Sequence, residues 1–491
     1  MRTDQQAGAA VPRGGARKML IGGRWEPAAS GAESPVTDPS TGLEIARVPA
    51  GKAADTDRAV AAARRAFEGT WQLATPAERG GMLWRLAGLV EEHADELAVT
   101  EAVDSGKPLA VARSRDVMLA ADVLRCVADW AGSGGAAAGA AMVPEQGMMA
   151  YPVLAPAGVV GVVVPWAFPL LMAVWQLAPA IAAGSAVVLK PAEQTPLSAL
   201  RLGELCQEAG FPDGIVNVVT GPAGAAVRLV TSPAVDRVTF TGCAEVGRQL
   251  ARAAAADPRK AVLRVGGRAP LVIFRDADID TAVAEATQAG FFSHFQTCTT
   301  GALLYAEKHV YDQVAAGVAE HARKLTAGPA LDPASRLGPL VSAGHFRRTR
   351  DYLAAALASG ADAAIGGGSL EGSGYFIEPT VLTAISPEAI PAATDVTGPV
   401  LPVLPFSDLR EIATPAGAGT RGGAAGVWTS DVSNARQAAA IVHAGTVWVN
   451  SYRIYDVTLP FGKTQHADWG PEILGDYLDR QSVIIQTRKA Q

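Results

Sequence analysis

Cys298 is the first candidate for covalent chemistry in this sequence. It follows a polar turn at residues 293–297 and precedes an apolar segment with the pattern of a strand. A cysteine thiolate can attack a carbonyl carbon and form a covalent intermediate. A free cysteine is also often a small buried hydrophobic side chain, so the pattern alone leaves both interpretations open. His294 lies four residues before Cys298. It could act as a base or serve as an ordinary polar packing residue.

Lys190 and Glu193 are candidates for contacts with a ribose. They follow an apolar run, Ser185–Leu189, that is typical of a buried strand. In open α/β sheets, ligands bind beyond the carboxyl ends of the strands. The glutamate could accept hydrogen bonds from ribose hydroxyl groups, and the lysine could donate to them. A solvent-exposed turn would show the same two residue types, so that alternative stays open.

The segment Thr241–Gly247 has the pattern of a phosphate-binding turn. It follows the predicted strand Arg237–Phe240 and opens a predicted helix, with Gly242 and Gly247 five residues apart. Glycines at such a turn allow a ligand to approach the amino terminus of the helix, where backbone amides and the helix dipole favour phosphate. An ordinary tight turn between a strand and a helix is the alternative interpretation.

The elements that would hold these residues alternate between strands and helices. From Pro156 to about Val262, five apolar strand-like segments are separated by helical patterns, and a second series starts after Gly266. Such alternation is typical of parallel sheets with helices on both faces. The sequence therefore predicts an α/β fold with two domains. The isolated apolar segment Ser482–Arg488 is expected to pair with the sheet edge of a neighbouring subunit.

One long segment carries no charge and needs a separate interpretation. Residues 146–189 contain no Asp, Glu, Lys or Arg, and an apolar stretch of about 18 residues or more is the usual signal of a membrane span. Because five prolines divide the segment, we expect strands at Gly158–Val164 and Ser185–Leu189 with a helix at Pro169–Ala183 between them. The sequence thus predicts a buried strand–helix–strand unit and no membrane association.

The overall composition excludes several classes of protein. The 491 residues are 49% hydrophobic, which supports large cores. Lys and Arg number 42 against 48 Asp and Glu, and no run of basic residues exceeds two, so we expect no nucleic-acid partner. The four cysteines form no CxxC pair and no metal-ligand spacing with the histidines, so we expect free thiols, no metal and a cytoplasmic location. Residues 1–18 lack the apolar core of a signal peptide and are expected to form a flexible tail.

In order and spacing, these segments resemble the aldehyde dehydrogenase superfamily over nearly the whole chain. Further matching segments are Ile21-Gly22-Gly23-Arg24-Trp25, Asp104-Ser105-Gly106-Lys107-Pro108, Val164-Pro165-Trp166, Gly398-Pro399-Val400, Gly445–Asn450 and Pro460-Phe461-Gly462. The resemblance implies a Rossmann-like cofactor domain at 19–131 and 152–265 and an α/β catalytic domain at 266–469. It also implies oligomerisation elements at 132–151, as a β-hairpin, and at 470–491, and hence a homodimer or homotetramer.

The resemblance assigns a role to each candidate residue. Cys298 matches the thiol that attacks the aldehyde, after which a hydride leaves the thiohemiacetal for NAD(P)⁺ and water releases the acid. Lys190 and Glu193 match contacts to the adenosine ribose, and a glutamate on the ribose hydroxyls disfavours a 2′-phosphate. NAD is therefore expected rather than NADP. The residues that match contacts to the pyrophosphate are Trp166, Gly242, Cys243, Val246 and Gly247.

The sequence departs from the family pattern at the residues nearest the chemistry. Ala167 stands where the family has the oxyanion-binding asparagine, and losing one such donor costs about 10²–10³ in rate in other enzymes. Arg264 stands in place of the general-base glutamate, and an arginine cannot remove a proton from water at neutral pH. It could instead lower the pKa of Cys298 or bind a substrate carboxylate. Asp395 and Thr397 replace the Glu and Phe that hold the nicotinamide half of the cofactor.

Three functions are compatible with this pattern. The first is an NAD-dependent aldehyde dehydrogenase with altered deacylation, in which the acyl group passes to an acceptor other than water, such as CoA. The second is an enzyme without a redox step that still uses Cys298 covalently. The third is a catalytically silent subunit that binds a nucleotide or a partner. Formation of NADH separates the first from the other two, and formation of a thiol adduct separates the second from the third.

Overall fold

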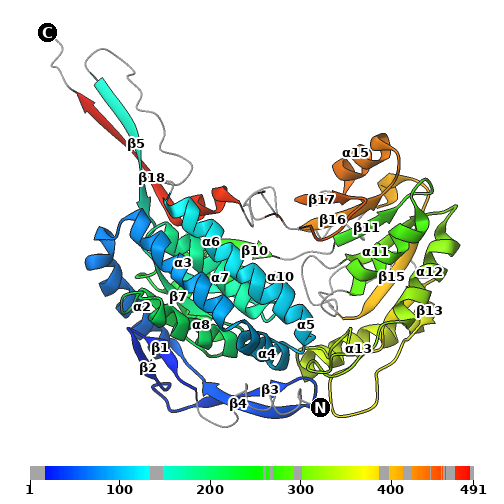
Figure 1. Ribbon diagram of the computed structural model, residues 1–491, viewed down its shortest axis with the longest axis horizontal. Coiled ribbons are helices and arrows are strands. Elements are labelled where there is room, and N and C mark those ends of the chain that lie inside the picture. The colour runs from blue at the N-terminus through cyan, green and yellow to red at the C-terminus, as the bar shows by residue number, and fades with distance from the viewer. Residues whose placement is uncertain are drawn as a thin grey trace.

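The computed structural model describes most of the chain as two lobes and a projecting arm. The described residues are 17–132, 148–257, 261–265, 269–291, 301–385, 398–412, 423–442, 444–454, 456, 459 and 470–486. Every structural statement below refers to these residues. Figure 1 shows one lobe around α3, α7 and β10, a second lobe around α12, α13 and β15, and an arm formed by β5 and β18.

The first lobe is built on a seven-stranded sheet with the order β10-β9-β6-β7-β8-β1-β2. Strands β10 to β8 run parallel, and β1 pairs antiparallel with both β8 and β2. This parallel arrangement confirms the predicted α/β fold. The strands are β1 (Met19–Ile21), β2 (Arg24–Glu26), β6 (Val159–Val163), β7 (Ala186–Lys190), β8 (Val216–Val218), β9 (Arg237–Gly242) and β10 (Ala261–Val265).

Helices pack against this sheet and bury its central strands. Every residue of β6 and β7 is buried, as expected of strands that are covered on both faces. The helices are α2 (Ala53–Glu68), α3 (Pro76–Glu92), α4 (Ala94–Ser105), α6 (Met118–Gly132), α7 (Pro169–Ala182), α8 (Leu197–Glu208), α9 (Ala223–Thr231) and α10 (Ala244–Ala253). A short helix, α5 (Leu109–Val111), and a π-helical turn, η2 (Ala112–Val117), connect α4 to α6. A separate antiparallel pair consists of β3 (Glu33–Asp38) and β4 (Leu43–Pro49).

The uncharged segment forms the strand–helix–strand unit that the prolines predicted. It contains β6, α7 and β7, which lie in the core of the first lobe. Pro169 is the first residue of α7, a position where the missing amide hydrogen costs nothing. Within the described part of the chain, every helix is too short or too polar to cross a lipid bilayer.

The second lobe repeats the α/β pattern with a sheet of its own. Its strand order is β13-β14-β15-β12-β11-β16-β17, and every neighbouring pair except β13–β14 is parallel. The strands are β11 (Ala269–Ile273), β12 (Gly301–Glu307), β13 (Asp362–Ile365), β14 (Thr380–Thr383), β15 (Val400–Phe406), β16 (Ala424–Trp428) and β17 (Thr446–Val449). The helices are α11 (Ile279–Phe291), α12 (Tyr311–Arg323), α13 (Ala343–Ala358) and α15 (Val432–Ile441).

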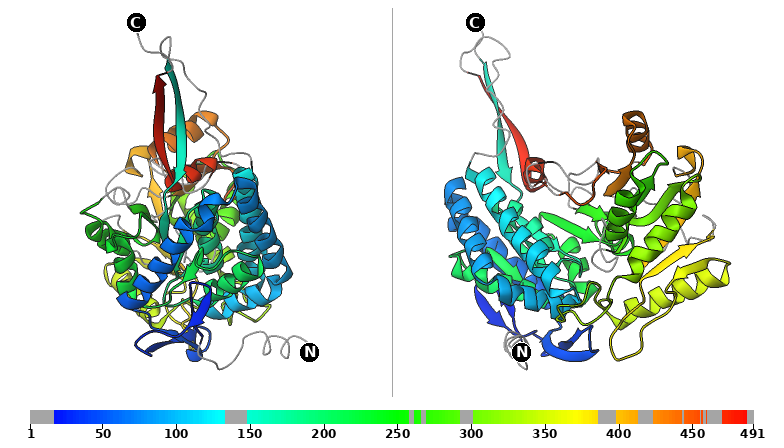
Figure 2. Two further views of the ribbon diagram at one scale, coloured as in Figure 1. Left: turned by 90° about the vertical axis from the view of Figure 1, so that its left-hand side faces the viewer. Right: turned by 45° about the vertical axis from the view of Figure 1, so that its right-hand side comes forward.

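The arm is an antiparallel pair of long strands that extends from the first lobe (Figure 2). Strand β5 (Met148–Pro156) pairs along its whole length with β18 (Leu478–Gln486), and the 3₁₀ segment η7 (Pro471–Tyr477) leads into β18. The segment Ser482–Arg488, predicted as an isolated strand, therefore begins earlier and has a partner in its own chain. The reason is that residues 148–156, which are uncharged, provide the antiparallel edge. Pairing with a second subunit remains a prediction.

Candidate active site

The carboxyl ends of four adjacent parallel strands bring most of the described candidate residues to one edge of the first sheet. In the strand register, Lys190 at the end of β7 lies beside Val163 of β6, and Val163 lies beside Phe240 of β9. Arg264 of β10 lies beside Thr241 of β9. Trp166, Lys190, Gly242 and Arg264 thus follow or end neighbouring strands, which is where open α/β sheets bind ligands. The strand register places these segments at one edge of the sheet, and their binding of a common ligand stays a prediction.

Lys190 is held in a buried position at the end of β7. Lys190 is only 5% exposed, and its carbonyl oxygen accepts a hydrogen bond of 3.2 Å from the backbone N–H of Val164. Burial of the ammonium group lowers the pKa of Lys190 to about 8, although the nearby carboxylate of Glu193 opposes that shift. Glu193 itself is exposed. A buried amine beside an exposed carboxylate presents both a donor and an acceptor to a polyhydroxyl ligand.

The loops after β6 and β7 are tied to each other. The hydroxyl group of Thr195 donates a hydrogen bond of 3.3 Å to the backbone oxygen of Trp166. Trp166 and Ala167 are partly exposed, and Ala167 offers no side-chain donor. The following residue, Phe168, has a left-handed backbone conformation with φ 52° and ψ 55°. The 166–168 turn thus presents only a methyl group at Ala167, the position predicted to match the family's oxyanion-binding asparagine.

The turn between β9 and α10 has the strand–helix geometry that the sequence predicted. Gly242 ends β9, Cys243 caps α10 with an extended backbone, and α10 begins at Ala244. A Cβ atom on Gly247 would come within 2.6 Å of a methyl group of Val265. The glycine thus permits close packing of α10 on β10. Cys243 is exposed and Val246 is partly buried, so the amino terminus of the helix is open to a ligand.

Arg264 is buried and bound by partners that the sequence did not reveal. Arg264 is 4% exposed, and its guanidinium group forms an ion pair with the carboxylate of Asp476 in η7. It also donates a hydrogen bond of 2.8 Å to the hydroxyl group of Thr239. Thr239 in turn donates to Gln176, and Gln176 donates to Thr241, each over 2.8 Å. The positive charge at this position is therefore compensated by a carboxylate of the same chain.

The described residues do not include four of the predicted site residues, which are Cys298, His294, Asp395 and Thr397.

The other three cysteines, Cys126, Cys206 and Cys243, are free thiols. Burial, with Asp129 and Asp456 nearby, raises the pKa of Cys126 to about 11. Burial also raises the pKa of Cys206 far above its usual range. Neither of these two thiols forms a thiolate readily at neutral pH.

One residue from the second lobe, His345, contacts Trp166, and the sequence reasoning missed both it and its neighbour Arg348. The His345 ring lies 5.3 Å from the Trp166 ring, centre to centre, with an angle of 56° between the planes. His345 is 3% exposed, and a guanidinium nitrogen of Arg348 lies 3.0 Å from its Nδ1 atom. Both residues belong to α13, whose amino terminus is capped by Ser342. The sequence signal was only this helix start, which says nothing about contact with Trp166.

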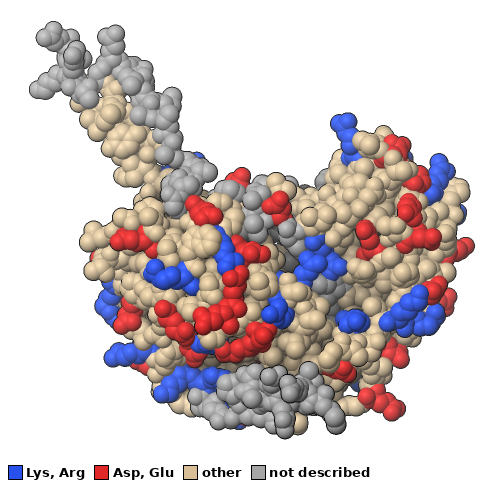
Figure 3. Space-filling model, in the orientation of Figure 1, with Lys and Arg blue, Asp and Glu red and all other residues tan. Residues whose placement is uncertain are grey.

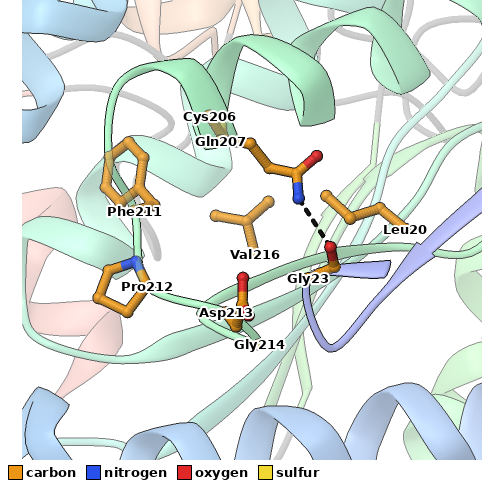
Figure 4. A pocket seen from close by; sticks show the side chains of 9 residues that line it. All are labelled: Leu20, Gly23, Cys206, Gln207, Phe211, Pro212, Asp213, Gly214 and Val216. Carbon is orange, nitrogen blue, oxygen red and sulfur yellow. Dashed lines mark hydrogen bonds between the residues drawn. The ribbon is translucent and has the colours of Figure 1, made fainter. Parts of the chain in front are cut away.

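The small pocket in Figure 4 is separate from this site. It is bounded by Cys206, Gln207 and the turn at Asp213–Gly214, and Gln207 donates a hydrogen bond of 2.8 Å to the Gly23 carbonyl oxygen. Asp213 precedes β8, so the pocket lies at the amino end of a strand that is parallel to β7. It therefore lies at the opposite edge of the sheet from Lys190.

The fold and this edge define an α/β protein with a nucleotide-type site, and comparisons with known proteins identify its family. The profile of the Aldehyde dehydrogenase family matches residues 25–483. Phenylacetaldehyde dehydrogenase of Pseudomonas fluorescens is 38% identical over 481 residues, which cover 95% of each chain. Aldehyde dehydrogenase 1A1 of Oryctolagus cuniculus is 36% identical over 476 residues, which cover 96% of this chain and 95% of the other.

A solved structure agrees with the sequence comparisons. The NAD⁺ complex of an aldehyde dehydrogenase from Bacillus cereus superimposes with a TM-score of 0.93 at 34% sequence identity, covering 98% of this chain and 99% of that one. The chain belongs to the aldehyde dehydrogenase family. The predicted resemblance and the predicted fold class are thereby confirmed.

Proposed function

We propose that this protein is an NAD-dependent aldehyde dehydrogenase-like oxidoreductase that uses Cys298 as its nucleophile. The observation that carries the proposal is the grouping of Lys190, Glu193, Trp166 and the 241–247 turn at one sheet edge. These residues are the ones expected to hold the adenosine and pyrophosphate parts of the cofactor. Family membership adds the reaction class, since the relatives named above are aldehyde dehydrogenases.

The described residues fit NAD at its adenosine end. Lys190 is a buried donor, and Glu193 is an exposed acceptor beside it, so together they suit the two hydroxyl groups of a ribose. Gly242, Cys243, Val246 and Gly247 surround an open helix amino terminus, which suits a pyrophosphate. The carboxylate of Glu193 would repel a 2′-phosphate, so NADP is disfavoured. NAD, when bound, accepts the hydride that leaves the substrate carbon.

The covalent chemistry would be carried by Cys298. Its thiolate attacks the aldehyde carbon, a carbon–sulfur bond forms, and the carbonyl electron pair moves to oxygen. When this oxygen reforms the carbonyl bond, a hydride is expelled and a thioester remains on Cys298. An acceptor nucleophile then attacks the thioester, releases the acyl product and returns the thiolate. Asp395 and Thr397 would hold the nicotinamide end less firmly than the family's Glu and Phe do.

Two substitutions are expected to slow the steps around the thioester. Ala167 supplies no side-chain donor to the oxyanion, and Arg264 cannot act as the base that activates water. The ion pair of Arg264 with Asp476 gives it a structural role instead. We therefore propose altered deacylation, in which either His294 replaces the base or the acyl group passes to an acceptor such as CoA. The substrate would be a small-molecule aldehyde or acyl compound.

A redox-free reaction is the second candidate. It is favoured by the residues at positions 167 and 264, because neither Ala167 nor Arg264 can assist the family reaction. In that case Cys298 would form a covalent adduct without hydride transfer. A silent subunit that only binds a nucleotide or a partner would form no adduct at all.

The arm is proposed to join this chain to a second copy. Met149 is 38% exposed, Ile484 is 67% exposed and Ile485 is 38% exposed, and β5 carries no charged residue. Figure 3 shows that the described surface of the arm is largely uncharged, whereas charges of both signs cover the body. Exposed apolar side chains on a strand pair support the proposal that the arm is buried in a homodimer or homotetramer. The free thiols agree with a cytoplasmic location.

We also propose the domain limits predicted from the sequence, although strand β5 (Met148–Pro156) crosses the limit between residues 151 and 152. The cofactor domain would comprise residues 19–131 and 152–265 after a flexible tail at 1–18. The catalytic domain would comprise 266–469, and the oligomerisation elements would comprise 132–151 and 470–491.

Mass spectrometry of Cys298 tests the proposed function. The protein is incubated with a panel of aldehydes, with and without NAD⁺, and digested for peptide mapping. The proposal predicts a thiohemiacetal adduct without NAD⁺ and, with NAD⁺, an acyl adduct lighter by two hydrogens. An adduct whose mass does not change with NAD⁺ would support the redox-free reaction. No adduct under either condition would contradict both enzyme proposals.

A further inference from the structure

The turn at 166–168 contains a strained residue. Phe168 adopts a left-handed backbone conformation that residues with a Cβ atom rarely occupy, and it is also the N-cap of α7. Residues in such conformations persist only where the surrounding structure holds them in place. Trp166 and Ala167, which precede Phe168, are the residues of this turn proposed to face the cofactor and the oxyanion.

A buried lysine lies directly against this strained residue. The ammonium nitrogen of Lys107 is 3.6 Å from the centre of the Phe168 ring, a distance at which a cation attracts the π face strongly. Lys107 is 3% exposed and forms an ion pair with Asp116 of η2, which is fully buried. Away from water, both interactions gain strength because solvent does not screen them.

A second residue of the same region holds the start of α7. Glu101, in α4, accepts a hydrogen bond of 3.0 Å from the backbone N–H of Leu170, the second residue of α7. Glu101 is fully buried. Phe168 and Leu170 are therefore fixed by two residues six positions apart, Lys107 through the ring and Glu101 through the backbone. Asp104, also buried, accepts from Leu197 and serves a different loop.

We propose that Lys107 is a positioning residue for the 166–168 turn. Its ammonium group keeps the Phe168 ring and backbone in place, and thereby sets where Trp166 and Ala167 stand at the sheet edge. Without this cation the strained conformation of Phe168 loses the cation–π contact to its ring, and the turn relaxes. The consequence for cofactor binding rests on the proposed function, whereas the consequence for the turn itself does not.

Hydrogen exchange and calorimetry on the full-length protein test this proposal together. Lys107→Met keeps most of the side-chain volume and removes the charge. We expect peptides covering residues 164–172 to exchange at least about tenfold faster, and the Kd for NAD⁺ to rise about tenfold, as the loss of a desolvated cation–π contact implies. Unchanged exchange in these peptides would overturn the proposal.

A matched control separates positioning from general loss of stability. Arg64 also lies over an aromatic ring, that of Phe67 at 5.7 Å, and pairs with Asp236. Asp236 precedes β9, so this cluster lies at the opposite edge of the sheet. Arg64→Met should leave both the 164–172 exchange and the Kd for NAD⁺ unchanged. Equal effects from Arg64→Met and Lys107→Met would overturn the proposal.

A second variant keeps the test valid if Lys107→Met does not fold. Phe168→Leu removes the ring but leaves the Lys107–Asp116 pair, and it should raise exchange and Kd to a similar extent. The double variant should show no more than the larger single effect, because each change removes the same contact between Lys107 and the Phe168 ring. Fully additive effects would contradict the proposal. If the wild type binds no NAD⁺, the proposed function fails, and the exchange data still decide the role of Lys107.

Discussion

Arg264 and Asp476 form an ion pair that joins strand β10 to the segment entering the arm. Arg264 belongs to the sheet that carries the candidate site, and Asp476 lies two residues before β18. The side chains are 3% and 18% exposed, so the pair is largely removed from water. The arginine that is predicted to stand at the family's catalytic-base position thus has an oppositely charged partner in its own chain. It links the site to the arm proposed to join subunits.

Breaking this pair should destabilise the protein strongly. Arg264→Met removes the buried guanidinium that faces the partly buried Asp476 carboxylate, and we expect a loss of about 3–5 kcal/mol in the free energy of unfolding. Arg264→Met with Asp476→Leu should recover most of that loss. Arg47→Met is the control, since Arg47 is 48% exposed in its pairs with Glu33 and Glu44, and it should cost under about 1 kcal/mol. Urea unfolding of the four proteins measures these differences, and equal losses for Arg264→Met and Arg47→Met would refute the assignment.

Restoring the family residues requires a third substitution. Ala167→Asn supplies an oxyanion donor and Arg264→Glu supplies a base, but the new glutamate would face Asp476 and be repelled by it. We expect the triple variant Ala167→Asn, Arg264→Glu, Asp476→Ala to raise steady-state NADH formation with aldehydes by about 10². The double variant that keeps Asp476 should gain less and unfold more easily. A triple variant that folds, binds NAD⁺ and forms no NADH would contradict the slowed-dehydrogenase proposal.

Nucleotide affinity should depend mainly on the adenosine half of the cofactor. Lys190 and Glu193 are retained, while Asp395 and Thr397 are expected to hold the nicotinamide weakly. Calorimetry should therefore give Kd values for ADP-ribose and NAD⁺ within about threefold of each other, a difference of under about 1 kcal/mol. Much tighter binding of NAD⁺ would show that the nicotinamide contacts are intact.

The affinity for ADP-ribose should fall between pH 7 and pH 9.5. Lys190, with a pKa of about 8, loses its proton across this range and becomes a weaker donor to the ribose. We expect Lys190→Met to bind more weakly at pH 7 and to show little dependence on pH. A wild-type affinity that stays constant up to pH 9.5 would exclude a bound ammonium at this position.

The pKa of Lys190 in the folded state is below its usual value, so the unfolded state binds more protons between about pH 8 and pH 10.5. Lys190 therefore adds to the free energy of unfolding as the pH rises through that window.

The sequence predicted the elements whose burial is nearly uniform. The apolar runs around Val160 and Val187 predicted covered strands, and Pro169 marked the start of α7 to the residue. The apolar pattern of Tyr375–Leu382 also predicts a strand, but β14 covers only Thr380–Thr383. Its apolar residues 375–377 lie in a loop instead, and proline at 379 has no amide hydrogen for a ladder.

The contacts between distant segments could not be predicted from the sequence. Arg264 and Asp476 are 212 residues apart, and the contact between Trp166 and His345 joins two different lobes. Each requires the fold before the partners meet. The local sequence around Arg264 predicts the absence of the family's base but says nothing about the partner of the arginine. Similarly, the Asp-Ser-Gly-Lys-Pro segment at 104–108 indicated the family, but not that Lys107 lies under the Phe168 ring.

A rapid-mixing measurement of NADH formation tests the central claim most directly. The wild-type protein with NAD⁺ is mixed with each aldehyde of a broad panel, and absorbance of NADH is followed from milliseconds to minutes. Because thioester formation is proposed to be retained and its hydrolysis slowed, we predict a burst of about one NADH per subunit, then a slow phase, with the acyl group on Cys298. Cys298→Ser should show no burst. If the wild type binds NAD⁺ but gives no NADH above the Cys298→Ser background with any aldehyde, the dehydrogenase account is contradicted.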